Sequence, residues 1–244
     1  MRRDVQILLG TACLGAVALW GERIPKALAT MEVFRVRDVE VRGARFLSEQ
    51  DIEGLLALTP ESSIWGEIQR WTDQVVSHPL VKTGRVTRKL PDGLLVSLVE
   101  RIPIALAPTP ALEPVDAEGY RLPLDPATYR LDLPILFSQE KTPEGARLVP
   151  EEVRRLAAEV DHLMAADSAF LRLVSSVEWT EKGSLLVRWT DPRVDFLLPS
   201  QASPMRLRAG LSALADAVLK YPGRVPSEID LRFSDQVVVR HQVD

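Results

Sequence analysis

Cysteine is almost absent from this chain of 244 residues, since Cys13 is its only cysteine. An internal disulfide framework is therefore excluded, and the chain beyond Cys13 has no thiol that could act as a nucleophile or metal ligand. Cys13 lies inside an apolar run, where a small buried residue is a better interpretation than a lipid-attachment site. A body without thiols is compatible with an oxidising compartment.

Histidine is also scarce, and neither sign of charge dominates. The three histidines, His78, His162 and His241, lack the spacing of metal ligands. Asp167-Ser168 could join His162 as one edge of a catalytic triad, but Asp and Ser at helix ends usually form turns. The net charge of −4 comes from 30 basic and 34 acidic residues and does not indicate nucleic-acid binding. With no phosphate-binding loop or G-x-S-x-G motif either, we expect no enzymatic activity, cofactor, metal site or small-molecule substrate.

Charge is missing altogether from Val5–Trp20, which contains no Asp, Glu, Lys, Arg or His. A helix of this length rises roughly 24 Å, so it crosses a hydrocarbon core of about 30 Å if Trp20 and Arg23 lie at the interface. We interpret the segment as a transmembrane anchor. Two alternatives stay open at this point: a signal peptide with a cleavage site at Ala27-Leu28-Ala29, and a buried helix of a soluble core.

The charges that flank this anchor nearly balance, because Arg2 and Arg3 precede it and Arg23 and Lys26 follow it. Long trailing domains are translocated largely regardless of charge. We therefore expect a single-pass protein of the cytoplasmic (inner) membrane, with its N-terminus inside and the bulk of the chain extracytoplasmic.

Strand and helix patterns alternate after the anchor. Phe34–Arg42 has the alternation of a strand, and Ser48 and Asp51 mark the N-terminus of a helix. A second helix is indicated by apolar residues at intervals of three and four, and His78-Pro79 ends it. The apolar positions of this second helix are Ile64, Ile68, Trp71 and Val75.

A hairpin completes this region. Val81–Lys89 and Leu94–Arg101 have strand patterns, and Leu90-Pro91-Asp92-Gly93 between them is a strong turn signal. Along the second strand, Leu94, Val96 and Leu98 are expected to face one way, and Leu95, Ser97 and Val99 the other. The resulting order of strand, helix, helix, strand and strand fills about seventy residues, which is a workable size for a small α+β domain.

The rest of the chain is predicted to be rich in β-structure, with one helix after Pro150 and another from Ser203-Pro204. The residues of the last helix that we expect to face inward are Leu207, Leu211, Leu214 and Val218. Besides short strands between 104 and 137, the expected strands are Val174–Trp179, Leu185–Trp189, Val194–Leu198, Ile229–Phe233 and Gln236–His241, the last two as a terminal hairpin.

Taken in order, these motifs resemble the FtsQ family of bacterial cell-division proteins, called DivIB in some bacteria. The most specific stretch is Val86-x-Arg88-x-Leu90-Pro91-x-x-Leu94-x-Val96, which continues to Glu100-Arg101-x-Pro103-Ile104-Ala105. The others are Phe34-x-Val36, Val39-x-Val41-x-Gly43, Asp51-Ile52, His78-Pro79-x-Val81, Val115-Asp116-x-x-Gly119, Leu133-Pro134 and Ile229-Asp230-Leu231-Arg232-Phe233. The chain departs from the family pattern at Leu198-Pro199, Asp235-Gln236 and His241.

The resemblance implies an α+β fold in three parts: an N-terminal transmembrane helix, a polypeptide-transport-associated (POTRA) domain of the form β-α-α-β-β, and a β-rich domain with flanking helices. The expected boundaries are 1–30 for the short cytoplasmic tail, anchor and juxtamembrane segment, 31–103 for the POTRA domain, and 104–244 for the FtsQ-type β domain.

The resemblance also implies a binding site. By its residues alone, Gln236–His241 is either an ordinary core strand or an edge that accepts a partner's strand. In FtsQ-like proteins the terminal strand receives FtsB, a bitopic division protein, in complex with FtsL. The matching positions here are Phe233, Asp235, Val237, Val238, Val239 and His241.

The function implied by the family is that of a non-enzymatic divisome scaffold, which binds membrane proteins of the FtsB/FtsL type and helps to assemble and regulate septal cell-wall synthesis. One alternative is a POTRA-bearing envelope adaptor for protein export or assembly, which would bind extended clients. Another is an exported hydrolase, which would require either a cleft with paired carboxylates or a Ser–His contact, such as one between His162 and a serine.

Overall fold

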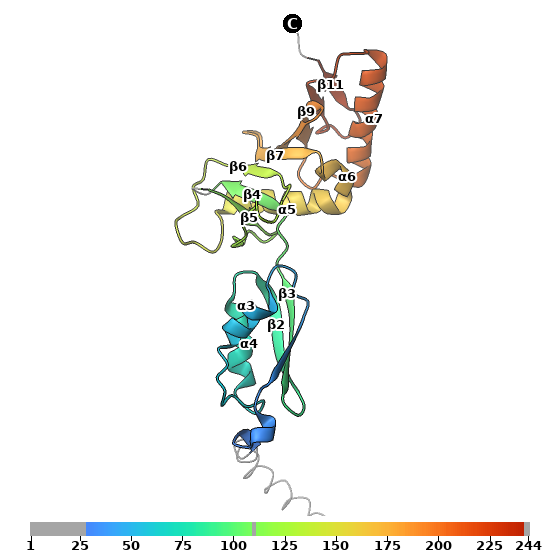
Figure 1. The fold of residues 1–244 in the computed structure, drawn as a ribbon. Coiled ribbons are helices and arrows are strands. Elements are labelled where there is room, and N and C mark those ends of the chain that lie inside the picture. Colours follow the sequence, from blue (N-terminus) through green and yellow to red (C-terminus); the bar gives the residue numbers. More distant parts are fainter. Residues whose placement is uncertain (1–27, 109–110, 242–244) are drawn as a thin grey trace, which may run out of the picture. The chain divides into compact units, whose positions relative to one another are not determined.

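The computed structural model describes residues 28–108 and 111–241 (Figure 1). The chain divides into two compact units between Arg101 and Ile102. Across the described ranges, no helix is both long and apolar enough to cross a membrane. The expected anchor, Val5–Trp20, lies outside the described residues and stays a prediction.

Unit 1 has the expected order of strand, helix, helix, strand and strand. Its sheet has the order β1-β3-β2, in which β1 runs parallel to β3 and β2 runs antiparallel to it. Figure 1 shows α3 and α4 together beside this sheet. The elements are the 3₁₀ turn η1 (Glu32–Phe34), β1 (Asp38–Arg42), α3 (Glu49–Leu56), α4 (Ile68–Ser77), β2 (Val81–Lys89) and β3 (Gly93–Glu100).

The first helix begins where the sequence predicts it. The Ser48 hydroxyl accepts a hydrogen bond from the Asp51 N–H, and the Asp51 carboxylate accepts one from the Ser48 N–H. This reciprocal capping box satisfies two backbone donors that the first turn leaves without helical partners, and such a cap contributes about 1 kcal/mol.

Two expected boundaries in unit 1 are wrong. Helix α4 begins at Ile68 and not at Ile64, because Ser63 bridges Arg35 and the Ile64 N–H donates to the Phe34 carbonyl. Ile64 is fully buried all the same. Strand β1 begins at Asp38 and not at Phe34, because Phe34 belongs to η1. Backbone pairing over a long sequence separation thus overrides both local patterns.

The core of unit 1 lies between the helices and the sheet. Along β3, Leu94 and Val96 are fully buried while Ser97 and Val99 are exposed, as a strand with one covered face requires. The buried apolar cluster consists of Ile52, Leu56, Ile64, Trp71, Val75, Val81, Val86, Leu94, Val96 and Leu98.

Unit 2 contains an eight-stranded sheet of the order β11-β10-β9-β8-β7-β6-β4-β5. Strands β7, β8 and β9 form an antiparallel meander, β6 runs parallel to both β4 and β7, and β10 runs parallel to β9. The elements are β4 (Ala105–Pro108), β5 (Leu112–Val115), β6 (Ile135–Phe137), α5 (Glu151–Ala166), α6 (Ser168–Leu171), β7 (Val174–Trp179), β8 (Leu185–Thr190), β9 (Arg193–Leu198), α7 (Pro204–Lys220), β10 (Glu228–Asp230) and β11 (Val238–Arg240).

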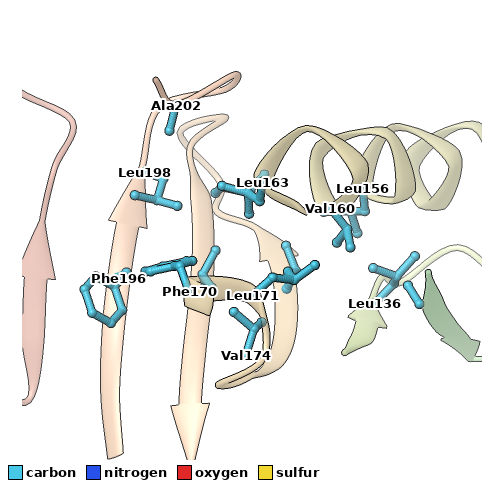
Figure 2. Packing of buried hydrophobic residues seen from close by; sticks show 14 of the residues in the cluster. Leu136, Leu156, Val160, Leu163, Phe170, Leu171, Val174, Phe196, Leu198 and Ala202 are labelled. Atoms are coloured by element: carbon cyan, nitrogen blue, oxygen red, sulfur yellow. The ribbon is translucent and has the colours of Figure 1, made fainter. Parts of the chain in front are cut away.

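Helices α5 and α6 close one continuous core over this sheet. Figure 2 shows Leu156 and Val160 of α5 near Leu136 of β6, and Phe170 of α6 near Phe196 of β9. The Phe170 and Phe196 ring centroids lie 5.2 Å apart at an interplanar angle of 77°, an edge-to-face arrangement. This packing holds the central strands that carry β10 and β11.

Two expectations for the end of the chain are wrong in detail. On α7, Leu207 and Leu214 are buried, but Val218 is exposed and Ala217 is buried in its place. The terminal hairpin is real but shorter than predicted, since β10 and β11 have three residues each and pair antiparallel. The connection is kept out of the ladder because Arg206 donates hydrogen bonds to the carbonyls of Phe233 and Ser234, and the Arg232 N–H donates to Asp230.

Candidate partner-binding edge

The terminal strand β11 lies at one end of the eight-stranded sheet. On one side it pairs with β10, with Glu228 opposite Arg240 and Asp230 opposite Val238. On its other side no strand from the described parts of the chain pairs with it. An edge of this kind directs backbone donors and acceptors outward, where an extended peptide can pair with them.

The hydrogen bonds of β10 show which residue of β11 faces outward. The Asp195 N–H donates to the Ser227 carbonyl, and the Leu231 N–H donates to the Leu197 carbonyl. Within β10, the backbone of Ile229 is therefore turned toward β9, and those of Glu228 and Asp230 are turned toward β11. Just before β10, the Ser227 N–H donates to the Arg240 carbonyl of β11, so the Arg240 backbone is turned toward β10. Because backbone groups alternate sides along a strand, Arg240 and Val238 face β10, and Val239 directs its N–H and C=O to the open edge.

The structure places the six expected site residues along this edge and its preceding loop. Val238 and Val239 lie within β11 and are half-buried, while Val237 precedes the strand and packs against the core. Phe233 and Asp235 are exposed in the loop between β10 and β11. His241 follows the strand, and its ring packs edge-on against Tyr221 with centroids 5.2 Å apart.

An ion pair between buried Asp230 and partly exposed Arg232 lies next to this edge. Asp230 in β10 is fully buried and accepts hydrogen bonds from Arg232 Nε at 2.8 Å and Arg232 Nη2 at 2.6 Å. The Arg232 guanidinium holds the pKa of the Asp230 carboxyl below its usual range, mainly through these hydrogen bonds. The carboxylate thus stays charged and fixes the chain where β10 leads into the loop.

A groove of about 300 Å³ lies beside the loop that precedes β11. Its walls come from the N-terminal turns of α7 and from the loop, and Met205, Arg206 and Ala209 were not among the expected site residues. Met205 is 80% exposed, and that exposure at the start of an amphipathic helix is the signal that could have pointed to it. The full lining is Ser203, Met205, Arg206, Ala209, Ser234, Asp235, Gln236 and Val237.

A second sheet edge, β2 in unit 1, is arranged differently. The Val86 N–H donates to the Thr72 hydroxyl of α4 at 3.2 Å, so the helix next to this edge already uses a backbone donor of the strand. The strand also carries Lys82 and Arg85, and charged side chains along an edge oppose strand addition. A groove of about 500 Å³ runs between α4 and β2, lined by both elements.

Comparison with known proteins identifies the family. A family model described as "POTRA domain, FtsQ-type" matches residues 34–101, which lie within unit 1. A curated "Cell division protein FtsQ" of Rhodothermus marinus is 28% identical over 222 residues, covering 87% of this chain and 80% of the relative. Another of that name, from Geotalea daltonii, is 24% identical over 253 residues, covering 98% of this chain and 88% of the relative. Residues 34–101 belong to the FtsQ-type POTRA family, and the chain is similar to FtsQ proteins over most of its length.

Residues that carry the family motifs have structural roles in this FtsQ-type chain. In the POTRA domain, buried Glu100 accepts hydrogen bonds from the N–H groups of Phe46 and Leu47 at 2.7 and 2.9 Å. In unit 2, Asp116 accepts from the Tyr120 N–H at 2.8 Å, and Gly119 adopts a φ of +81° where a Cβ would meet Arg154 at 2.9 Å. The Asp-x-x-Gly motif therefore forms a turn that admits only glycine at its last position.

The titratable residues considered for catalysis are held in structural contacts. His162 Nε2 lies 3.1 Å from the Ala202 carbonyl oxygen, whereas the Ser–His form of the hydrolase alternative requires a serine there. Asp167 accepts hydrogen bonds from the N–H groups of Ala169 and Phe170, as the N-cap of α6. Among the residues that the structure describes, no group of His, Cys, Asp and Glu has the arrangement of a metal site.

Proposed function

We propose that this chain is a non-enzymatic scaffold of bacterial cell division, anchored in the cytoplasmic membrane by Val5–Trp20 with both folded units outside. The curated relatives named above are cell-division proteins that match most of the chain, which favours division over the export-adaptor alternative. The scaffold would help to assemble and regulate septal cell-wall synthesis through the membrane proteins it binds.

The proposed partner is a bitopic protein of the FtsB type, in complex with one of the FtsL type, whose extended segment adds a strand to β11. The observation that carries this proposal is the position of β11 at the end of the sheet, with Val239 directing its backbone outward. Backbone hydrogen bonds would supply affinity, and alternate side chains would supply specificity. Anchoring both proteins in one membrane raises their effective concentration.

Phe233, Asp235, Val237 and His241 flank the strand and would contact the partner's side chains rather than its backbone. Phe233 is 42% exposed beside Arg232, a combination that suits an aromatic or acidic partner residue. Asp235 and Val237 line the groove next to α7, which could receive the partner chain as it leaves the strand. We propose this set as the recognition surface.

The test is capture of the organism's own FtsB–FtsL pair, in detergent, by the Val239→Pro chain. Proline removes the outward N–H without touching the bonds between β10 and β11. A lost buried hydrogen bond costs about 1–3 kcal/mol, so affinity should fall about tenfold or more. Val239→Ala is the matched control, because it keeps the N–H and should capture the pair nearly as well as the native chain.

Val238→Pro sharpens the experiment. Because Val238 faces β10, this change should loosen the hairpin itself, and hydrogen exchange in β10 should rise together with the loss of capture. Val239→Pro should leave that exchange unchanged. Native-like affinity in a folded Val239→Pro chain would exclude strand addition at this edge.

A further inference from the structure

Three of the exposed apolar side chains of the POTRA domain lie at one end of it. Five large apolar side chains are exposed in the part of unit 1 that the structure describes: Met31, Val33, Val76, Leu90 and Val99. Three of them, Met31, Val33 and Leu90, lie where the chain enters the domain and where the β2–β3 hairpin turns, and Figure 1 shows these two places at the same end of the unit. We call these three residues the apolar tip.

Backbone contacts tie the two parts of the apolar tip together. The Arg37 N–H donates to the Asp92 carbonyl in the hairpin turn at 2.8 Å. The Val36 N–H donates to the Ser62 carbonyl at 2.8 Å, and Phe34 packs edge-on against Trp65 with centroids 5.9 Å apart. Hydrogen bonds and ring packing therefore hold both the segment that follows Met31 and Val33 and the hairpin turn that carries Leu90.

The covalent chain limits how far this tip can lie from the end of the expected anchor. Eight residue steps separate Trp20 from Leu28, and a fully extended chain spans at most about 29 Å over that distance. Val33 lies only five residues beyond Leu28. If the anchor reaches the membrane surface at Trp20, the chain length therefore keeps Met31 and Val33 close to that surface.

The charges around the tip indicate apolar contact rather than electrostatic attraction. The four basic residues near the tip are matched in number by four acidic ones: Arg35, Arg37, Arg88 and Lys89 against Glu32, Asp38, Glu40 and Asp92. Lys89 Nζ lies 3.0 Å from Asp38 Oδ2 and 2.9 Å from Glu40 Oε2, so Lys89 forms ion pairs within the domain. A surface that bound anionic headgroups would carry a cationic excess instead.

We propose that the apolar tip rests in the interfacial layer of the membrane, with Leu90 at the hairpin turn and Met31 and Val33 beside the anchor as its contact points. The inference rests on the proposed anchoring by Val5–Trp20. It sets the orientation of the POTRA domain at the membrane, because contacts at the anchor side and at the hairpin turn together restrict tilting.

The experiment uses the full chain with Cys13→Ala, which removes its only thiol, and adds single cysteines for a polarity-sensitive fluorophore. Leu90→Cys and Met31→Cys report on the tip, and their exposure of 68% and 51% keeps the substitutions out of the core. Val99→Cys is the matched control, because Val99 is 56% exposed but lies about 20 Å along β3 from Gly93. The protein is reconstituted in vesicles of phosphatidylethanolamine and phosphatidylglycerol that contain a shallow nitroxide-labelled lipid.

The expected result is a shift of emission to shorter wavelength and strong nitroxide quenching at positions 90 and 31, with neither effect at position 99. Because the contact is apolar, quenching should persist in high salt and in vesicles without phosphatidylglycerol. Quenching that disappears under those conditions would overturn the apolar contact.

The other outcomes separate this inference from the proposals on which it rests. A chain that floats with the vesicles and captures FtsB–FtsL, but shows equally weak quenching at positions 90 and 99, overturns the tip contact alone. A wavelength shift that arises only when the FtsB–FtsL pair is added would show that the apolar tip contacts a protein partner. That result would also overturn the proposed contact with the membrane. A chain that does not float overturns the anchor together with this inference.

Discussion

Two of the edge strands, β2 in the POTRA domain and β11 in unit 2, differ in how readily a partner strand could pair with them. Strand β2 is nine residues long and carries Lys82 and Arg85, and its Val86 N–H donates a hydrogen bond to the Thr72 hydroxyl of the neighbouring helix α4. Strand β11 is three residues long, begins with two valines, and directs the backbone of Val239 outward. Charged side chains and a covering helix oppose the addition of a strand to β2, whereas the one charged side chain of β11, Arg240, is paired with Glu228 across the ladder. The difference favours β11 over β2 as the proposed edge for a partner strand.

The substitution expected to weaken the β11 edge most is Asp230→Asn. The change leaves the Arg232 guanidinium beside a neutral side chain at a fully buried position. We expect the opening free energy of the β10–β11 hairpin to fall by about 2–3 kcal/mol and partner capture to fall with it. Hydrogen exchange of peptides from 226–241 measures the first effect. Asp235→Asn, at an exposed position in the same loop, should change the opening free energy little, and equal effects of the two substitutions would contradict this role of Asp230.

Acid should weaken the same edge in a predictable direction. Because Arg232 lowers the pKa of Asp230 in the folded protein, the stabilisation is complete above the ordinary carboxyl pKa of about 4 and is lost as the pH falls below it, through the folded pKa. Exchange protection of the native hairpin should therefore decline at acid pH, while the Asp230→Asn chain shows a smaller decline. A gap between the two proteins that stays constant with pH would argue against this linkage.

Thr72→Val tests whether the hydrogen bond between β2 and α4 matters for the stability of the POTRA domain and for partner capture. Valine keeps the shape of threonine but removes the acceptor of the Val86 N–H, so the POTRA domain should lose about 1 kcal/mol of stability. Exchange of the Val86 amide should rise, while capture of the FtsB–FtsL pair stays unchanged, because β11 is untouched. Stronger capture by this variant would show instead that the partner strand adds to β2, where the Val86 N–H has become available.

The smallest effect is expected from Arg240→Ala. Arg240 pairs with Glu228 across the β10–β11 ladder, and the two side chains are 53% and 28% exposed. An ion pair of this kind contributes about 0.2–1 kcal/mol, so capture should weaken by less than about fivefold. High salt should produce a similar small loss in the native chain and none in the variant. A loss as large as that of Val239→Pro would show that the Arg240 side chain itself binds the partner.

Much of the POTRA domain was predictable because its signals are local. Ser48 and Asp51 cap α3, His78-Pro79 ends α4, and the alternation through Leu94 and Val96 places the buried face of β3. The errors occurred where distant backbone pairing overrides a local pattern. Ile64 fits the helical spacing of α4, yet its amide pairs with Phe34, thirty positions earlier in the chain.

The candidate site was predictable only in part. The β-propensity of Val237, Val238 and Val239 indicates a strand, and the family resemblance indicates its role. Neither shows that Val238 and Val239 face opposite ways in the ladder, that Asp230 is buried with Arg232, or that Met205 and Arg206 of α7 border the same loop. Those relations join residues that lie up to about thirty positions apart, and propensity carries no information about them.

By itself, the sequence determined the order of the main helices and strands and most of their covered faces, because caps, proline and hydrophobic period act within a few neighbouring residues. It also determined that the chain beyond Cys13 has no thiol. Only the tertiary structure decided which strand is left at the edge. Strand β6 inserts between β4 and β7, and β10 between β9 and β11, and such pairings are selected by burial over the whole sheet rather than by any local signal.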